Sequence, residues 1–212
     1  MKTKLLIFDV DGTLVDSLGD HYETDKKIIE NLQGVAPSLE EYMGILGRVT
    51  DWNKFYEQFG VSDSEKATAL FYKLISERAP RAIPEAYELL SKVRRMNIPH
   101  CALSINENPY SVHKKLLGAR LLDYFINSVY SDPKTKTEVI REVCKERGID
   151  YNNAILIGDT EKDIREGKEV GVVTVGVSNK YSFSPEEDIN KAQPNYLIHD
   201  IRDLEKIIKW KS

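Results

Sequence analysis

The stretch FDVDGTLVDS, residues 8–17, places two aspartates two positions apart directly after an apolar run. Residues 5–8 form a continuous apolar segment, which is typical of a strand covered on both faces in a parallel sheet. Asp9 then lies at the carboxyl end of that strand, the edge at which open α/β sheets bind ligands. Asp-Gly is also ordinary turn chemistry, and an aspartate after a strand can simply cap the next helix.

The spacing of Asp9 and Asp11 distinguishes these two interpretations. Side chains two residues apart point the same way in extended backbone, so both carboxylates would share one crevice. Their mutual repulsion then requires a neutralising partner. A divalent cation, a lysine or a proton held on one of the two carboxylates would serve.

Strand-like apolar runs recur along the chain with helical patterns between them. After the first run they comprise residues 101–103, 128–130, 154–157, 172–175 and 196–198. Alternation of strands and helices predicts βαβ units around a parallel sheet. We therefore expect an α/β fold, a Rossmann-like parallel sheet core with helices on both faces.

The segment from residue 16 to residue 79 interrupts this alternation. It carries helical patterns only, among them YETDKKIIENL, SLEEYMGILG, WNKFYEQFG and SEKATALFYKLISER. Pro80 and Pro84 stiffen the return of the chain into the core. We expect residues 16–79 to form an inserted all-α cap, and residues 1–15 and 80–212 to form the core.

Composition narrows the class of partner. The formal net charge is −4, whereas nucleic-acid binding needs a concentrated basic face, so we expect no nucleic-acid partner. No segment approaches the roughly 18 apolar residues of a membrane span, and the N-terminus leads straight into a strand. We expect a cytoplasmic monomer or small homo-oligomer that binds small molecules. Cys101 and Cys144 lack a metal-ligand spacing and are expected to be buried free thiols.

A second acidic motif follows the fourth strand-like run, in AILIGDTEKDI at residues 154–164. Gly158 suits a tight turn from strand to helix, and Asp159 and Asp163 lie four residues apart on one helical face. Helix capping explains one of these acids but explains the second only weakly. Acidic clusters at the carboxyl ends of two parallel strands predict a hard-cation site, and carboxylate oxygens suit Mg²⁺.

Two further groups follow other strands. Ser104, after HCAL, offers a hydroxyl for an anionic oxygen, although most serines at strand ends are only turn residues. Lys134 and Lys136 lie in SDPKTKTEVI, at the start of a helical pattern, where a solvated lysine is the default interpretation.

The order of these motifs resembles the haloacid dehalogenase superfamily, specifically its phosphatase branch with a small helical cap. The resemblance rests on DVDGT, Ser104, Lys134 or Lys136, and GDTEKD, and it covers nearly the whole chain. It implies that Asp9 is the nucleophile and Asp11 the general acid and base. It further implies that Ser104 binds the phosphoryl group.

The resemblance also implies Mg²⁺ as the cofactor, with Asp9, Asp11, Asp159 and Asp163 around it. Asp159 is then the expected ligand of the fourth motif, and Asp163 a ligand or a partner of one. Lys134 and Lys136 precede Asp159 by 25 and 23 residues, and both spacings resemble those of the family. We favour Lys134, because it directly follows the SDP turn, and expect only one of the two lysines to serve the site.

The chemistry implied is phosphomonoester hydrolysis through an aspartyl-phosphate on Asp9. Asp11 must carry a proton to the leaving oxygen, so we expect an environment that raises its pKa. Gly12 and Thr13 complete the loop, and their backbone N–H groups are expected to bind phosphate oxygens.

Other activities remain open. A phosphosugar mutase of the same superfamily would use all these residues, a dehalogenase would not need Asp11, and a phospho-acceptor or binding module would need neither Asp11 nor a cap. In the cap, Arg48 could bind a carboxylate or second phosphate of the substrate, although an arginine there more often complements a helix end. His21, Tyr22 and Trp52 could line the pocket or pack inside the cap. The sequence does not identify the phosphorylated metabolite.

Overall fold

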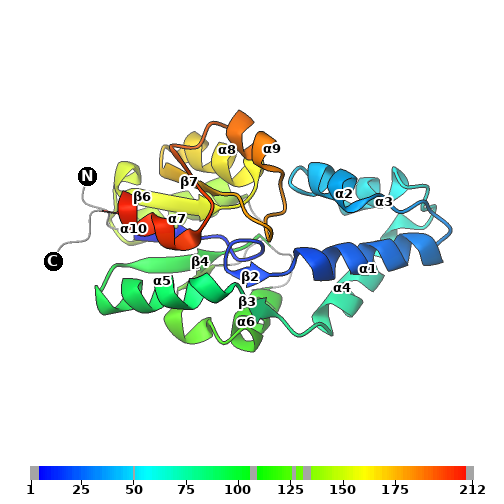
Figure 1. Ribbon diagram of the computed structural model, residues 1–212, viewed down its shortest axis with the longest axis horizontal. Helices are drawn as coiled ribbons and strands as arrows, with labels where there is room; N and C mark the ends of the chain where they lie inside the picture. The colour runs from blue at the N-terminus through cyan, green and yellow to red at the C-terminus, as the bar shows by residue number, and fades with distance from the viewer. Residues whose placement is uncertain (1–4, 50, 106–108, 126–127, 131–134, 209–212) are drawn as a thin grey trace.

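A six-stranded sheet forms the centre of the computed structural model, which describes residues 5–49, 51–105, 109–125, 128–130 and 135–208 (Figure 1). The strand order is β5-β4-β1-β6-β7-β8, and every neighbouring pair is parallel. The strands are β1 (Leu5–Phe8), β4 (His100–Leu103), β5 (Val129–Tyr130), β6 (Ala154–Gly158), β7 (Val173–Val177) and β8 (Tyr196–Ile198).

Both faces of this sheet are covered. Successive side chains of β1 alternate between two apolar clusters: Leu6 and Phe8 enter one, Leu5 and Ile7 the other. The first cluster includes side chains of α5, α6 and α10, and the second includes side chains of α7 and α8. The prediction of a parallel sheet with helices on both faces is confirmed. The helical elements of the core are α5 (Pro84–Arg95), α6 (Pro109–Gly118), α7 (Lys136–Glu146), α8 (Glu161–Val170), α9 (Glu186–Lys191), α10 (Leu204–Ile207), and the short 3₁₀ turns η1 (Leu122–Phe125), η2 (Tyr151–Asn153) and η3 (Ile201–Asp203).

Four helices occupy the segment predicted as the cap, at the end of the molecule away from the chain termini (Figure 1). They are α1 (Leu18–Asn31), α2 (Leu39–Leu46), α3 (Trp52–Glu57) and α4 (Ser64–Ser76). The chain enters and leaves this segment through β2 (Val15–Asp16) and β3 (Arg81–Ala82), which pair antiparallel. The entry and exit of the four-helix segment therefore lie beside each other.

The cap helices bury their apolar faces against one another. Their side chains form a separate cluster, which Phe183 of the core joins. Inside the cap, Asp25 is fully buried and accepts hydrogen bonds from the hydroxyls of Tyr42, at 2.6 Å, and Tyr56. Burial raises the pKa of Asp25 to about 6, against the effect of these two hydrogen bonds.

Two further predictions can be compared with the structure. Cys101 on β4 and Cys144 on α7 are buried and free, as expected. Among the residues described, no helix is both long enough and apolar enough to cross a membrane. Location in the cytoplasm and oligomeric state stay predictions.

Candidate active site

Asp9 lies at the carboxyl edge of the sheet, as the sequence predicts. Its backbone N–H donates to the carbonyl of Ile157 at 2.8 Å, which continues the pairing of β1 with β6 by one residue. The side chain is buried, and one carboxylate oxygen accepts a hydrogen bond from Lys136 Nζ at 2.5 Å. The middle of the sheet thus fixes the carboxylate, and a lysine from another element contacts it.

Lys136 is the first residue of α7. The helix starts here because the Thr135 side chain accepts from the N–H of Glu138 and the Glu138 carboxylate accepts from the N–H of Thr135. From this first turn, Lys136 Nζ also donates to Asp163. The charges of Asp163 and Asp9 outweigh burial and raise the pKa of Lys136, so the side chain stays cationic.

The position of Lys136 bears on the choice between the two lysines. The helix begins where the sequence analysis places it, but a first-turn lysine reaches Asp9 after all, because its long side chain extends back over the sheet edge. Lys134, the residue favoured from the sequence, lies outside the described residues. The observed contacts support Lys136, the alternative.

Asp159 and Asp163 complete a buried carboxylate cluster with Asp9. Gly158 ends β6, and any side chain there would collide with Asp163, whose carbon atoms lie within 2.6 Å of a hypothetical Cβ. Asp163 accepts from the N–H of Thr160 at 3.1 Å and from its hydroxyl at 2.6 Å, and so it also caps α8. Capping therefore accounts for part of the role of Asp163, as the sequence analysis allows.

The donor set of this cluster fits a divalent cation. Asp9, Asp159 and Asp163 each present a carboxylate oxygen within 4.8 Å of the others. Burial, followed by the charges of Asp9 and Asp163, raises the pKa of Asp159 well above its ordinary value. Burial likewise raises the pKa of Asp9, and Lys136 only partly opposes this. One lysine does not balance three buried carboxylates, and oxygen ligands suit Mg²⁺.

Asp11 occupies a different environment from Asp9. Its two oxygens accept from Lys115 Nζ at 2.6 and 2.7 Å, and one also accepts from the Ser17 hydroxyl at 2.6 Å. Burial alone would raise the pKa of Asp11, but the adjacent Lys115 ammonium, with smaller contributions from His21 and Ser17, lowers it to about 2. The expectation of a raised pKa is wrong for this conformation, because the sequence gave no sign of the lysine.

The carboxylate of Asp11 also lies outside the cluster of three that could hold a metal among the described residues. Its oxygens are engaged by Lys115 and Ser17 instead. The expectation that the Asp11 side chain helps to bind the cation therefore has no support in this geometry.

Gly12 and Thr13 have structural tasks in the loop. Gly12 has a φ of +72°, and a side chain there would collide with Asp159, whose oxygen lies 2.2 Å from a hypothetical Cβ. Its N–H donates to the carbonyl of Val15 at 2.9 Å, so this N–H is not free for phosphate, contrary to expectation. The hydroxyl of Thr13 donates to Asp159 at 3.0 Å and orients that carboxylate. Ser104 is buried directly after β4, whose neighbour in the sheet is β1.

Arg48 contacts the core instead of a pocket. Its guanidinium binds Glu161 at 2.7 Å and Asp188 at 2.8 Å, which joins the cap to the core beside α8 and α9. The expected substrate role is not supported by these contacts. Tyr22 donates to the carbonyl of Pro37, and Trp52 stacks on Phe71, so both pack inside the cap.

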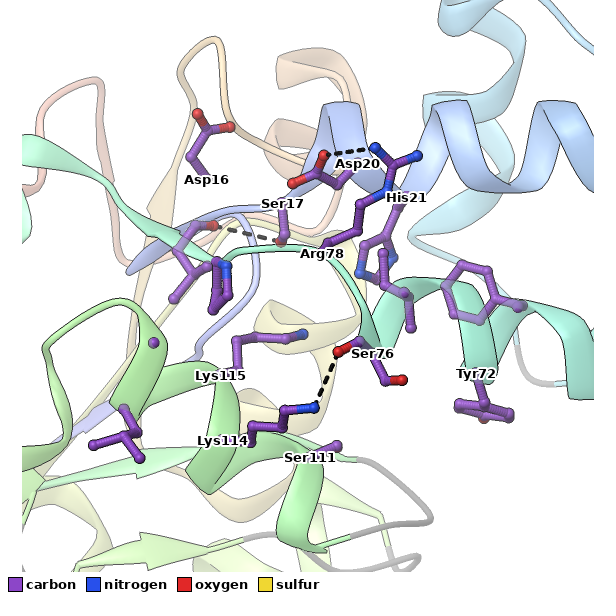
Figure 2. A pocket seen from close by; sticks show the side chains of 16 residues that line it. Asp16, Ser17, Asp20, His21, Tyr72, Ser76, Arg78, Ser111, Lys114 and Lys115 are labelled. Atoms are coloured by element: carbon purple, nitrogen blue, oxygen red, sulfur yellow. Dashed lines mark hydrogen bonds and ion pairs between the residues drawn. The ribbon is translucent and has the colours of Figure 1, made fainter.

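A pocket of about 620 Å³ opens between the cap and α6, on the side of Asp11 (Figure 2). Ser17, His21 and Lys115 all line it and all lie beside Asp11. His21 Nε2 is 3.9 Å from Asp11 Oδ1, and burial lowers the pKa of His21 to about 4. Sequence reasoning considered His21 but missed Ser17 and Lys115, which belong to no recognised motif.

The profile of the haloacid dehalogenase-like hydrolases matches residues 6–177 of this chain. The chain belongs to this family. The resemblance identified from the two acidic motifs is thereby confirmed, and the catalytic groups described above lie within the matched segment.

Curated relatives extend over nearly the whole chain. Phosphoglycolate phosphatase of Neisseria meningitidis is 29% identical over 215 residues, which cover 93% of this chain and 90% of the relative. Phosphoglycolate phosphatase of Mannheimia succiniciproducens is 25% identical over 226 residues, covering 97% and 98%. The protein is a phosphatase of the haloacid dehalogenase-like family.

Solved structures share the fold. A haloacid dehalogenase-like hydrolase from Streptococcus pneumoniae aligns with a TM-score of 0.80 at 17% identity, covering 97% of this chain and 98% of that chain. A Bacteroides vulgatus structure described as a beta-phosphoglucomutase aligns with a TM-score of 0.73 at 20% identity, covering 97% and 87%. At these identities the likeness concerns the fold alone.

Proposed function

We propose that the protein hydrolyses phosphate monoesters of small metabolites through an aspartyl-phosphate on Asp9, with Mg²⁺ as cofactor. The observation that carries the proposal is the buried Asp9 carboxylate, bound by Lys136 and gathered with Asp159 and Asp163 at the carboxyl edge of the sheet. This edge is where parallel sheets of this type bind ligands.

Asp9 acts as the nucleophile. One carboxylate oxygen attacks phosphorus and the ester oxygen leaves, so that a single difficult displacement becomes two easier ones. Lys136 holds the attacking carboxylate in place and supplies positive charge to the phosphoryl oxygens, where positioning and electrostatics provide most of the rate enhancement. The hydroxyl of Ser104 serves as a further donor to the phosphoryl group.

Asp11 moves the proton. It donates to the leaving oxygen in the first step and accepts a proton from the attacking water in the second. In this conformation Asp11 is held ionised by Lys115 and Ser17. The first step therefore needs Asp11 to shift away from Lys115 toward the ester oxygen, which raises its pKa because the stabilising ion pair is weakened.

Asp9 and Asp159 would hold the cation, with Asp163 beside them as a further oxygen donor or as the anchor of Lys136. When bound, Mg²⁺ neutralises the surplus negative charge of the cluster and of the phosphoryl group. Thr13 and the N–H of Phe183, at 2.7 Å, keep Asp159 oriented for that role.

The relatives named phosphoglycolate phosphatases make 2-phosphoglycolate one reasonable substrate to test, together with other small phosphate esters. Transfer of the phosphoryl group to a second sugar hydroxyl, as in a mutase, uses the same groups on Asp9 and Asp11. The two outcomes differ in whether free phosphate is released.

The test combines turnover with trapping of the intermediate. Phosphate release from p-nitrophenyl phosphate is measured with Mg²⁺ and with EDTA, and borohydride is added during turnover to reduce an aspartyl-phosphate to homoserine. Mass spectrometry should place homoserine at position 9 only when substrate and Mg²⁺ are both present. Modification at another residue, or release of phosphate that EDTA does not affect, would overturn the proposal.

A further inference from the structure

The pocket beside Asp11 has an unusual concentration of polar donors on one helix. Ser111, Lys114 and Lys115 all line it, and their spacing places them on one face of α6. In Figure 2 the side chains of Lys114 and Lys115 extend from this helix toward the cap residue Ser76. The floor of the pocket thus presents two ammonium groups and a hydroxyl.

These donors have capacity left for a ligand. Lys115 uses two of its three protons on Asp11, and Lys114 Nζ donates to the backbone carbonyl of Ser76 at 3.1 Å. Within the described part of the chain, the buried hydroxyl of Ser111 has no hydrogen-bond partner, and neither do the two ring nitrogens of His21. Buried polar groups without a partner are rare and call for an explanation such as a bound ligand.

The opposite wall belongs to the cap and has two parts. Phe71 and Ile75 supply an apolar surface, while Arg78 supplies a third cation. Arg78 is 3.8 Å from Asp20, so that acid balances part of its charge. Asp16, the other acid of the pocket, is 3.7 Å from Arg81. The charge on the α6 side is therefore not balanced by the acids on the cap side.

We propose that Ser111, Lys114 and Lys115 bind a second anionic group on the leaving group of the substrate. The inference rests on the proposed function, because it takes Asp9 as the place of the reacting phosphoryl group and Asp11 as its proton donor. Lys115 links the two sites: its third proton faces the pocket while the other two bind Asp11. A carboxylate and a second phosphate are equivalent in this chemistry.

The size of the pocket agrees with this assignment. A volume of about 620 Å³ exceeds the needs of an inorganic ion and falls in the range of sites for small organic ligands. The carbon skeleton of the leaving group would lie against Phe71 and Ile75, with its anion on the α6 face. A neutral leaving group would leave both lysines without a partner anion and should bind more weakly.

Matched pairs of substrates test the inference. 3-Phosphoglycerate and glycerol 3-phosphate differ only in a carboxylate against a hydroxymethyl group, and 1,3-propanediol bisphosphate is paired with its monophosphate. We expect kcat/KM to favour the anionic member of at least one pair by a factor on the order of 10 or more, which corresponds to one good charge-assisted contact. The pair that shows the preference identifies the anion as carboxylate or phosphate.

Variants connect the preference to the named face. Lys114→Met should reduce the ratio of the two kcat/KM values at least about fivefold, and Lys114→Arg should retain most of it, since the charge is kept. Lys145→Met, at an exposed lysine of α7 away from the pocket, is the matched control and should leave the ratio unchanged. A ratio that is unchanged in Lys114→Met would overturn the proposal.

Binding to an inactive variant separates this proposal from the proposed function. Dissociation constants of both substrate pairs are measured by calorimetry on folded Asp9→Asn, in which the chemical step is blocked. A tenfold preference for the anionic member supports the anion site even if turnover data contradict Asp9 as nucleophile. Equal affinity within both pairs, together with normal hydrolysis of p-nitrophenyl phosphate, would reject the anion site and leave the proposed function standing.

Discussion

Asp9 in the core and Asp25 in the cap are both buried carboxylates with pKa values raised by burial, but their partners differ. Asp9 lies next to a lysine and two further acids, in a site whose charges do not balance. Asp25 has two tyrosine hydroxyls, which satisfy its oxygens without any charge. A carboxylate held by neutral donors is typical of structure, whereas one placed among competing charges indicates chemistry.

Asp9→Asn provides the largest expected effect. An amide of the same shape cannot attack phosphorus, so kcat should fall by a factor on the order of 10³ or more while the fold is kept. Asp25→Asn is the matched control from the cap, and its kcat should stay within about threefold of wild type. The comparison fails if Asp9→Asn keeps a tenth of the activity, or if the two variants lose activity equally.

Lys136→Ala should have the next largest effect. Removal of the ammonium that contacts Asp9 and Asp163 should lower kcat by a factor on the order of 10², the range for loss of one charge-stabilising donor. Lys134→Ala is the natural control, with an expected change below about threefold. Steady-state rates of both folded variants decide the matter, and the reverse ranking would return the role to Lys134.

Asp159→Asn should act on the cation response. Because Asp159 offers an oxygen to the cluster, the Mg²⁺ concentration for half-maximal activity should rise by about 10-fold or more. Thr13→Val removes only the hydroxyl that orients Asp159 and should give a smaller rise in the same direction. An unchanged Mg²⁺ titration for Asp159→Asn would place the metal site elsewhere.

The cap carboxylate predicts an effect of pH on stability. Asp25 has a folded pKa of about 6 against an ordinary value of 3.8, so the folded state holds its proton more tightly. Its stabilising contribution is complete below about pH 4 and is lost as pH rises through 6. Asp25→Asn cannot ionise, so its free energy of unfolding relative to wild type should increase by about 1 to 3 kcal/mol from pH 4 to pH 7.

Denaturant unfolding of both proteins across this pH range measures the difference. Asp20→Asn, a change at a partly exposed acid of the same helix, serves as the control and should show little pH-dependent difference. A flat difference between Asp25→Asn and wild type would mean that the tyrosine hydroxyls keep Asp25 ionised in the folded state.

Arg48→Ala should have the smallest effect. The guanidinium is 51% exposed, so its ion pairs with Glu161 and Asp188 contribute about 1 kcal/mol or less. We expect kcat/KM within about threefold of wild type for every substrate. A loss of tenfold or more, specific to substrates with a second anion, would restore the substrate role considered from the sequence and weaken the assignment to α6.

The sequence predicts the core well because local pattern decides it. The apolar runs at residues 5–8, 154–157 and 196–198 recur as β1, β6 and β8 within one residue at each end. The four helical patterns of the cap likewise recur as α1–α4. In these segments the hydrophobic period and the capping residues agree with the final environment.

The surroundings of Asp11 are not predictable in the same way. Lys115 meets Asp11 across 104 positions of sequence, and HKKLLGAR reads as an ordinary solvated helix face. Only the packing of α6 against the β1–β2 loop turns that lysine toward the aspartate. The sequence therefore predicts that Asp11 is special, but the sign of its pKa shift depends on a contact that no motif records.

The two-residue pairing of β2 with β3 has a consequence for how such a protein can change over evolution. Val15 pairs with Ala82 and Asp16 with Arg81, so the polypeptide departs from the core and rejoins it at a single point. An insertion with adjacent ends can be lengthened, shortened or exchanged for another module at little cost, since the closure entropy of a loop grows only slowly with its length. Substrate preference can thus diverge by exchange of the inserted module, while the residues that perform the reaction stay where the sheet holds them.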